Sequence, residues 1–185
     1  MCLFIPVSTA VNANAWDTQY RQIEQRIKQP EFANRVVYIT KYGASPKAKA
    51  QVNQSAINKA IDICSRAGGG RVIVPAGLYN TGAITMKSKV NLVVDKGATL
   101  LFVFQPELYP VVPTRWEGLD CWNLSPCIYA YKVKDVAITG EGTIDGGGTN
   151  DTWWKWCGAE KFGWKPGTIS QRNGSRAQLQ KYAED

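Results

Sequence analysis

The chain has 185 residues, 44% of them hydrophobic, and carries a formal net charge of +7. This length can hold one domain with a sizeable core. The hydrophobic content excludes an intrinsically disordered chain, and no apolar run is long enough to span a membrane. The positive charge fits an ordinary soluble surface but also favours a polyanionic partner. Because there is no long block of like charges and no nucleic-acid-binding motif, an acidic polysaccharide explains the charge as well as a nucleic acid does.

Residues 1–15 have the pattern of a secretion signal. An apolar stretch runs from Cys2 to Val7, and Ala13-Asn14-Ala15 has the small-x-small form of a cleavage site. The basic segment that opens such signals is missing, so we expect residues 1–15 to be a remnant whose true start lies upstream. An apolar N-terminal strand is the alternative. The pattern predicts a secreted or periplasmic protein.

The cysteines give no sign of a metal centre. They stand at positions 2, 64, 121, 127 and 157, with no Cys-x-x-Cys spacing, and the chain has no histidine. Zinc sites need such ligands at short spacings, so we expect no metal and no cofactor. Cys121 and Cys127 are close enough in sequence to pair, but buried free thiols are the expected state.

The N-terminal third predicts two helices around one strand. Apolar residues at 16, 20, 23 and 27 define one helix face, and Pro30 ends that helix. A strand is expected at 36–39, a turn at 42–44 and a surface loop at 45–54. A second helix is predicted from Ser55 to Arg66, with Gly68 ending it. The glycines at 68–70 lead into a strand, so they do not form a phosphate-binding loop, which needs the order strand, loop, helix.

The following segment is a series of short β-branched runs separated by turn residues. The runs are 72–74, 83–86, 90–94 and 99–102, and they resume at 128–131, 136–139 and 142–146. Runs this short predict strands rather than helices. Between them lies a long excursion, residues 105–126, and long ordered loops on a repetitive scaffold often carry binding sites. We expect the coils to stack and to point these side chains inward: Val72, Val74, Ile84, Leu92, Val94, Leu100, Ile138 and Ile144.

The order of several motifs resembles the N-terminal portion of a polygalacturonase-like enzyme of glycoside hydrolase family 28. The motifs are Tyr42-Gly43-Ala44, the helix at 56–62, Gly68 to Gly77, Thr139 to Gly146 and Trp153-Trp154. Other pectin-active β-helix enzymes share the opening part, from Tyr42-Gly43-Ala44 through the helix to Gly68-Gly69-Gly70. The resemblance implies an all-β fold, a right-handed parallel β-helix or solenoid, with N-terminal capping helices and truncated on its C-terminal side. Residues 16–185 would then be the N-terminal part of a single β-helix domain.

The same resemblance implies hydrolysis of α-linked galacturonan or rhamnogalacturonan in pectin, with inversion. Inversion needs one carboxylic acid on the leaving oxygen and one carboxylate that activates water. The family places its aspartates in Asn-Thr-Asp and Asp-Asp motifs and adds Gly-His-Gly and Arg-Ile-Lys. This chain has none of the first three, so we expect no catalytic residue in it. Arg26-Ile27-Lys28 lies too early to match the family motif, and Asp145, beside glycine, is expected to make a turn.

Arg115 and Trp116, on the excursion, are the candidate substrate-binding residues. Trp116 would stack on a sugar ring and Arg115 would pair with a uronate carboxylate. The alternative is structural: Trp116 holds the loop against the coil, and Arg115 pairs with Glu117. The tryptophans at 153, 154 and 156 are expected to cover a coil edge rather than to bind sugar.

Two functions remain open after this reading. One is the front part of a secreted pectin hydrolase, a monomer at full length, that binds no nucleic acid and no membrane and is inactive as this chain alone. The other is a non-catalytic β-helix that binds polysaccharide. A lyase is less favoured because acidic calcium-binding clusters are not found in the sequence. Asn-Thr-Asp, Asp-Asp and Gly-His-Gly motifs beyond residue 185 would indicate the hydrolase.

Overall fold

The computed structural model describes residues 13–116, 118–168 and 170. The chain divides into two compact units, residues 1–30 and residues 31–185. The first contains helix α1 (Ala13–Arg26), which forms where the apolar repeat predicted a helix. Most of the predicted signal remnant, up to residue 12, lies outside the described residues. The predicted domain boundaries, 1–15 and 16–185, stay predictions.

The second unit is built mainly of short strands. They are β1 (Val36–Tyr38), β2 (Gly70–Val74), β3 (Gly77–Thr81), β4 (Ile84–Thr85), β5 (Val90–Val94), β6 (Ala98–Phe102), β7 (Val111–Trp116), β8 (Leu119–Leu124), β9 (Ile128–Tyr129), β10 (Ala137–Thr139) and β11 (Thr143–Asp145). The helical elements are η1 (Ile39–Tyr42), α2 (Ala50–Arg66), η2 (Pro106–Leu108), η3 (Trp153–Cys157) and η4 (Glu160–Phe162). No described helix is both long and apolar enough to cross a membrane.

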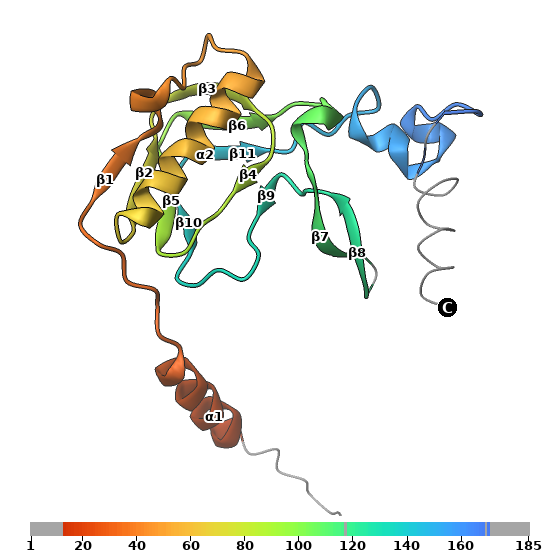
Figure 1. Ribbon diagram of the computed structural model, residues 1–185. Helices are drawn as coiled ribbons and strands as arrows, with labels where there is room; N and C mark the ends of the chain where they lie inside the picture. Colours follow the sequence, from red (N-terminus) through yellow and green to blue (C-terminus); the bar gives the residue numbers. More distant parts are fainter. Residues whose placement is uncertain (1–12, 117, 169, 171–185) are drawn as a thin grey trace, which may run out of the picture. The chain divides into compact units, whose positions relative to one another are not determined.

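Successive coils place equivalent strands side by side (Figure 1). One parallel sheet has the order β1-β2-β5-β10, a second has β11-β6-β3, and a third pairs β4 with β9. The register aligns Val72 with Leu92 and Leu92 with Ile138. These short parallel sheets, which do not close on themselves, confirm the predicted coils.

The core lies inside the stacked coils. Of the side chains expected to point inward, Val72, Val74, Ile84, Leu92, Val94 and Leu100 are all buried. Ile138 and Ile144 align with Leu92 and Leu100 and so lie on the same inward face, but each is 44% exposed. They belong to β10 and β11, which are edge strands of their sheets. No further coil among the described residues covers these two side chains.

Helix α2 covers the opposite end of the stack, beside β2, β3 and β4 (Figure 1). It begins at Ala50, so the predicted loop at 45–54 was wrong over its second half. The helix starts earlier because Ala50 and Asn53 already lie on the buried face that continues through Ile57 and Ile61. We expected more than one capping helix, but in this unit α2 alone, among the described residues, is an α-helix.

The end of α2 explains the run of three glycines. Gly69 donates its N–H to the carbonyl of Cys64 and has a φ of +97°. A Cβ on Gly69 would meet the carbonyl of Lys89, and one on Gly70 would meet that of Arg35. Glycine is therefore required for the chain to leave the helix and enter β2 between two neighbouring coils.

Polar side chains of α2 also satisfy the backbone of the first coil. Asn53 donates to the carbonyl of Asn80 at 3.0 Å and accepts from the N–H of Ser45 at 2.8 Å. Asn58 donates to the Ala83 carbonyl at 3.1 Å and accepts from the Thr85 N–H at 2.8 Å. These bonds reach β3, β4 and the turn between them, where no earlier strand is available for pairing. The helix thus replaces a missing coil in hydrogen bonding as well as in packing.

Two parts of the strand prediction were incomplete. The excursion at 105–126 was expected to be a loop, but it contains an antiparallel hairpin of β7 and β8. Its first strand contains Pro113, a residue that usually argues against a strand. Strand β3 was missed because its sequence, GLYNT, is largely polar and turn-like; Tyr79 and Thr81 nevertheless point into the core.

We predict that Leu92→Ala destabilises the protein by about 2–5 kcal/mol, because Leu92 is fully buried and truncation leaves a cavity. Ile138→Ala is the matched control, since Ile138 aligns with Leu92 one coil further along but is half exposed. Urea unfolding followed by circular dichroism measures both. Equal losses for the two variants would show that the inward face has been assigned wrongly.

Asn53→Ala should also destabilise the protein, by about 1–3 kcal/mol, because it leaves the Ser45 N–H and the Asn80 carbonyl without their partner. Gln51→Ala, on the exposed face of the same helix, is the control and should change the free energy of unfolding by less than about 0.5 kcal/mol. The same denaturation experiment compares them. A loss for Asn53→Ala no larger than that for Gln51→Ala would contradict the proposed role of α2 in satisfying the first coil.

Candidate functional site

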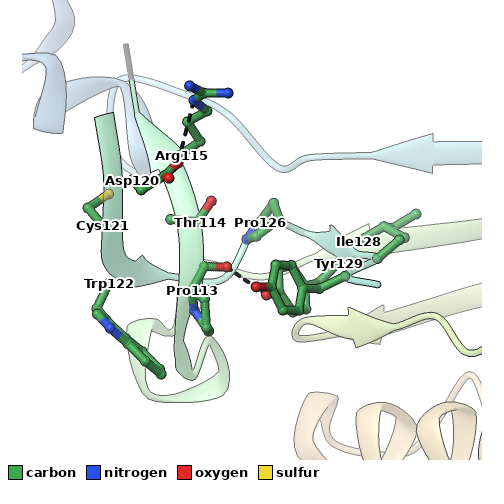
Figure 2. Close-up of a pocket in the computed structure, with 11 residues that line it drawn as sticks. Pro113, Thr114, Arg115, Asp120, Cys121, Trp122, Pro126, Ile128 and Tyr129 are labelled. Atoms are coloured by element: carbon green, nitrogen blue, oxygen red, sulfur yellow. Dashed lines mark hydrogen bonds and ion pairs between the residues drawn. The ribbon is translucent and has the colours of Figure 1, made fainter. Parts of the chain in front are cut away.

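A cleft lies between the β7–β8 hairpin and the chain segment that contains β9 (Figure 2). Its volume is about 750 Å³. The lining combines aromatic rings, prolines and one pair of opposite charges: Pro113, Thr114, Arg115, Asp120, Cys121, Trp122, Pro126, Ile128, Tyr129, Ala130 and Tyr131. A cleft with apolar walls and a few polar groups is the usual form of a small-ligand or oligomer site.

The hairpin is held to the stack at its base. The N–H of Ser125 donates to the carbonyl of Pro110 at 2.8 Å, and Leu124 packs against the core. Further along, the hydroxyl of Tyr129 donates to the carbonyl of Pro113 at 2.6 Å, the contact drawn in Figure 2. The first bond closes the base of the hairpin, and the second joins the excursion to the coil that follows it.

Aromatic side chains form much of the cleft surface. The rings of Tyr129 and Tyr131 are stacked with centroids 6.1 Å apart, and Trp122 on β8 is 71% exposed. Removal from water raises the pKa of Tyr129, and the neighbouring Tyr131 raises it further. Tyr129 therefore stays protonated and keeps donating its hydrogen bond at neutral pH. Exposed aromatic faces of this kind suit stacking on the apolar face of a sugar.

Sequence reasoning missed these aromatic residues. Tyr129 and Tyr131 do carry a signal, because two residues apart in an extended segment their side chains point to the same side. Trp122 carries none, because its position depends on the antiparallel register of the hairpin, where it lies opposite Pro113.

Arg115 lines the cleft, which is the position that its predicted role in binding needs. Its Nε lies 3.5 Å from Oδ1 of Asp120 and donates to the Gly118 carbonyl at 3.2 Å. Both charged side chains are largely exposed, and an exposed ion pair of this kind adds little stability. The structural alternative paired Arg115 with Glu117, which lies outside the described residues. Binding of a uronate carboxylate by Arg115 stays a prediction.

Trp116 is not among the residues that line the cleft. It lies at the end of β7, opposite Leu119, and is half-buried. Its predicted stacking on a sugar therefore stays a prediction, and the structure brings Trp122 rather than Trp116 to the cleft beside Arg115.

The tryptophans after residue 150 have different surroundings. Trp153 packs edge-on against Phe104 at 4.7 Å and Tyr109 at 5.1 Å, next to the core. This matches the expected role of covering a coil edge. Trp154 is 51% exposed and contacts Phe162.

The other chemical candidates take structural roles. Oδ1 of Asp145 accepts the N–H of Gly147 at 2.8 Å, which is the turn expected at that position. Arg26, at the end of α1, donates to the carbonyl of Gln22 at 3.2 Å. Cys64, Cys121, Cys127 and Cys157 are free thiols, and burial raises the pKa of Cys64 and of Cys127. The described part of the chain holds no cluster of three or more residues suited to bind a metal ion.

The chain is similar to known pectin-degrading enzymes. It is 35% identical over 122 residues to an exo-poly-α-D-galacturonosidase of Dickeya chrysanthemi, an alignment that covers 62% of this chain and 20% of that enzyme. No protein-family model matches the chain.

Solved structures give the same result. An exopolygalacturonase from Thermotoga maritima superposes with a TM-score of 0.83 at 37% identity, covering 91% of this chain and 37% of that one. A family 28 exopolygalacturonase from Yersinia enterocolitica superposes with a TM-score of 0.54 at 32% identity, covering 62% of this chain and 21% of that one. The chain thus spans well under half the length of these enzymes. It is homologous to a portion of the polygalacturonases of glycoside hydrolase family 28, which confirms the resemblance predicted from its sequence.

Proposed function

We propose that this chain forms the first coils of a right-handed parallel β-helix in an exported enzyme that hydrolyses α-linked galacturonan or rhamnogalacturonan with inversion. The observation that carries the proposal is the superposition on an exopolygalacturonase over 91% of the chain at 37% identity. The two chains are similar in sequence as well as in fold, whereas a shared fold alone would not indicate a shared function.

The cleft supports the substrate class. Stacked Tyr129 and Tyr131, with Trp122 facing solvent, offer flat apolar surfaces to pyranose rings. Arg115 retains guanidinium donors beyond those used for Gly118 and Asp120, and guanidinium groups bind carboxylates in a bidentate manner. Rings and one cation in a single cleft fit a polymer of uronic acids better than a neutral glucan.

The residues of this chain do not provide the chemistry of hydrolysis by themselves. Inversion needs an acid and a base on opposite faces of the glycosidic bond. Asn-Thr-Asp, Asp-Asp and Gly-His-Gly motifs are absent from its sequence. Asp145 is committed to a turn, and Asp120 is paired with Arg115. We therefore propose that this chain binds the polymer and that the carboxylates for catalysis belong to other residues of the full enzyme.

A second candidate is a non-catalytic β-helix that binds an acidic polysaccharide. The observation in its favour is the same absence of the aspartate and histidine motifs. Both candidates bind polygalacturonate, so binding tests the substrate class and turnover separates the enzyme from the binding module. Export is proposed for both because of the apolar and small-residue pattern at 1–15.

We expect Trp122→Ala to weaken binding of oligogalacturonides about two- to tenfold, the scale of one lost aromatic contact. The control is Trp154→Ala, which removes another exposed tryptophan outside the cleft and should bind as the unmodified chain does. Isothermal titration calorimetry measures both. Equal weakening by both substitutions, or none by either, would place the sugar elsewhere.

The purified chain should release no reducing ends from polygalacturonate. A positioned acid and a positioned base each contribute about 10²–10⁴-fold, and without them groove residues should give no measurable rate. A reducing-sugar assay over many hours tests this, with Asp145→Asn as the informative variant. Turnover by the unmodified chain that disappears in Asp145→Asn would show that Asp145 is catalytic and that the chain is active alone.

A further inference from the structure

Exposed cations gather at one corner of the coil stack, where the chain turns into the sheet β1-β2-β5-β10. They come from separate turns: Arg35 precedes β1, Lys87 and Lys89 precede β5, and Lys132 and Lys134 precede β10. All of these residues are exposed. We call this set the basic corner. It does not include Arg115 of the cleft.

Hydrogen bonds from side chain and backbone link these turns to one another. The guanidinium of Arg35 donates to the Gly69 carbonyl at 2.8 Å, and the Gly70 N–H donates to the Lys89 carbonyl at 2.9 Å. The Lys89 N–H donates in turn to the Lys134 carbonyl at 2.9 Å. Neighbouring strands lie about 4.8 Å apart. The turns before β5 and β10 are therefore about one strand spacing apart, whereas the turn before β2, residues 67–69, carries no cation.

The charges of the corner are available to a ligand. None of these cations forms an ion pair with another described residue. Asp135, which directly follows Lys134, adds one negative charge beside these cations. Lys132 lies 5.1 Å from the centre of the Tyr131 ring, a cation–π contact that leaves its charge in solvent.

Two of the lysines occupy unfavourable backbone conformations. Lys89 has a φ of +64° and Lys132 a φ of +53°, and they share this left-handed region with Asp135 alone among the described residues other than glycine. Glycine adopts it at no steric cost, and Asp or Asn does so with a smaller penalty than Lys. Side chains kept in strained positions are concentrated at functional sites. The strain thus indicates that the lysine side chains themselves are needed there.

We propose that the basic corner is a binding site for a linear acidic polysaccharide, separate from the Arg115 side of the cleft. Tyr131 lines the cleft and immediately precedes Lys132, so one polymer chain can leave the stacked tyrosines and continue along the corner. Carboxylates of the polymer pair with the lysine ammonium groups, and water remains at the exposed contacts. The choice of a polysaccharide rests on the proposed function.

The lysines of the corner do not by themselves separate a nucleic acid from a polysaccharide, because ammonium groups pair with phosphates as well as with carboxylates. The polysaccharide is favoured by the similarity of the chain to polygalacturonases. Binding of an RNA or DNA strand is therefore an outcome that the test must be able to detect.

The decisive variant is Lys89→Gly with Lys132→Gly, because glycine suits both backbone positions. Binding of size-fractionated polygalacturonate should weaken about fivefold or more, since exposed charge contacts are individually weak but act together. The melting temperature should stay the same or rise as the backbone strain is relieved. The matched control is Lys47→Gly with Lys96→Gly, which removes two exposed lysines elsewhere in the same unit and should leave binding unchanged.

The measurement is fluorescence anisotropy with labelled polygalacturonate, repeated with labelled single-stranded RNA and at two salt concentrations. Binding by the unmodified chain that weakens in the Lys89/Lys132 variant, with a smaller salt dependence, supports the corner. If the unmodified chain binds and the variant binds equally well, the corner proposal is overturned while the proposed function stands. If the unmodified chain does not bind polygalacturonate, the proposed function fails, and preferential binding of RNA through the corner overturns the polysaccharide partner.

Discussion

A stack of parallel strands leaves a row of unpaired N–H and C=O groups at its end, and the rest of this structure depends on how that row is satisfied. Side-chain amides of helix α2 satisfy part of that row. Asn53, Gln54 and Asn58 donate to carbonyls around β3 and β4. Its apolar face meanwhile covers the open core. Because the first coil is fixed in this way, each later coil can align in register on the one before it.

The fixed register determines where functional groups lie. Turns at the same position in successive coils are stacked, so cations far apart in the sequence become neighbours at the basic corner. The inserted hairpin β7–β8 departs from the stack between β6 and β9 and returns to contact Tyr129 through the carbonyl of Pro113. One scaffold thus presents two surfaces with different chemistry, an aromatic cleft and a row of charges. Both surfaces are consistent with an extended acidic polymer as ligand.

Local signals in the sequence were sufficient to find the excursion, and binding by its residues stays a prediction. The excursion was identified as a place for binding, and Arg115 does line a cleft there. Trp116 was the aromatic residue predicted beside it, but it is the last residue of β7 and does not line the cleft. The residue that shares the cleft with Arg115 is Trp122, which reaches it only because the hairpin is antiparallel with Pro113 opposite Trp122. A register between distant segments is not encoded in any short motif.

The sequence by itself determined most strands of the coils, though not β3 or the β7–β8 hairpin, and the resemblance to pectin-degrading enzymes, because β-branched runs and glycines act locally. It also determined the inward face of the central coils, from Val72 to Leu100. Only the tertiary structure decided that α2 starts at Ala50 and that Ile138 and Ile144 are half exposed. It also decided that lysines from separate turns meet at one corner. These features depend on which coil lies next to which, and burial and proximity arise only once the coils have stacked.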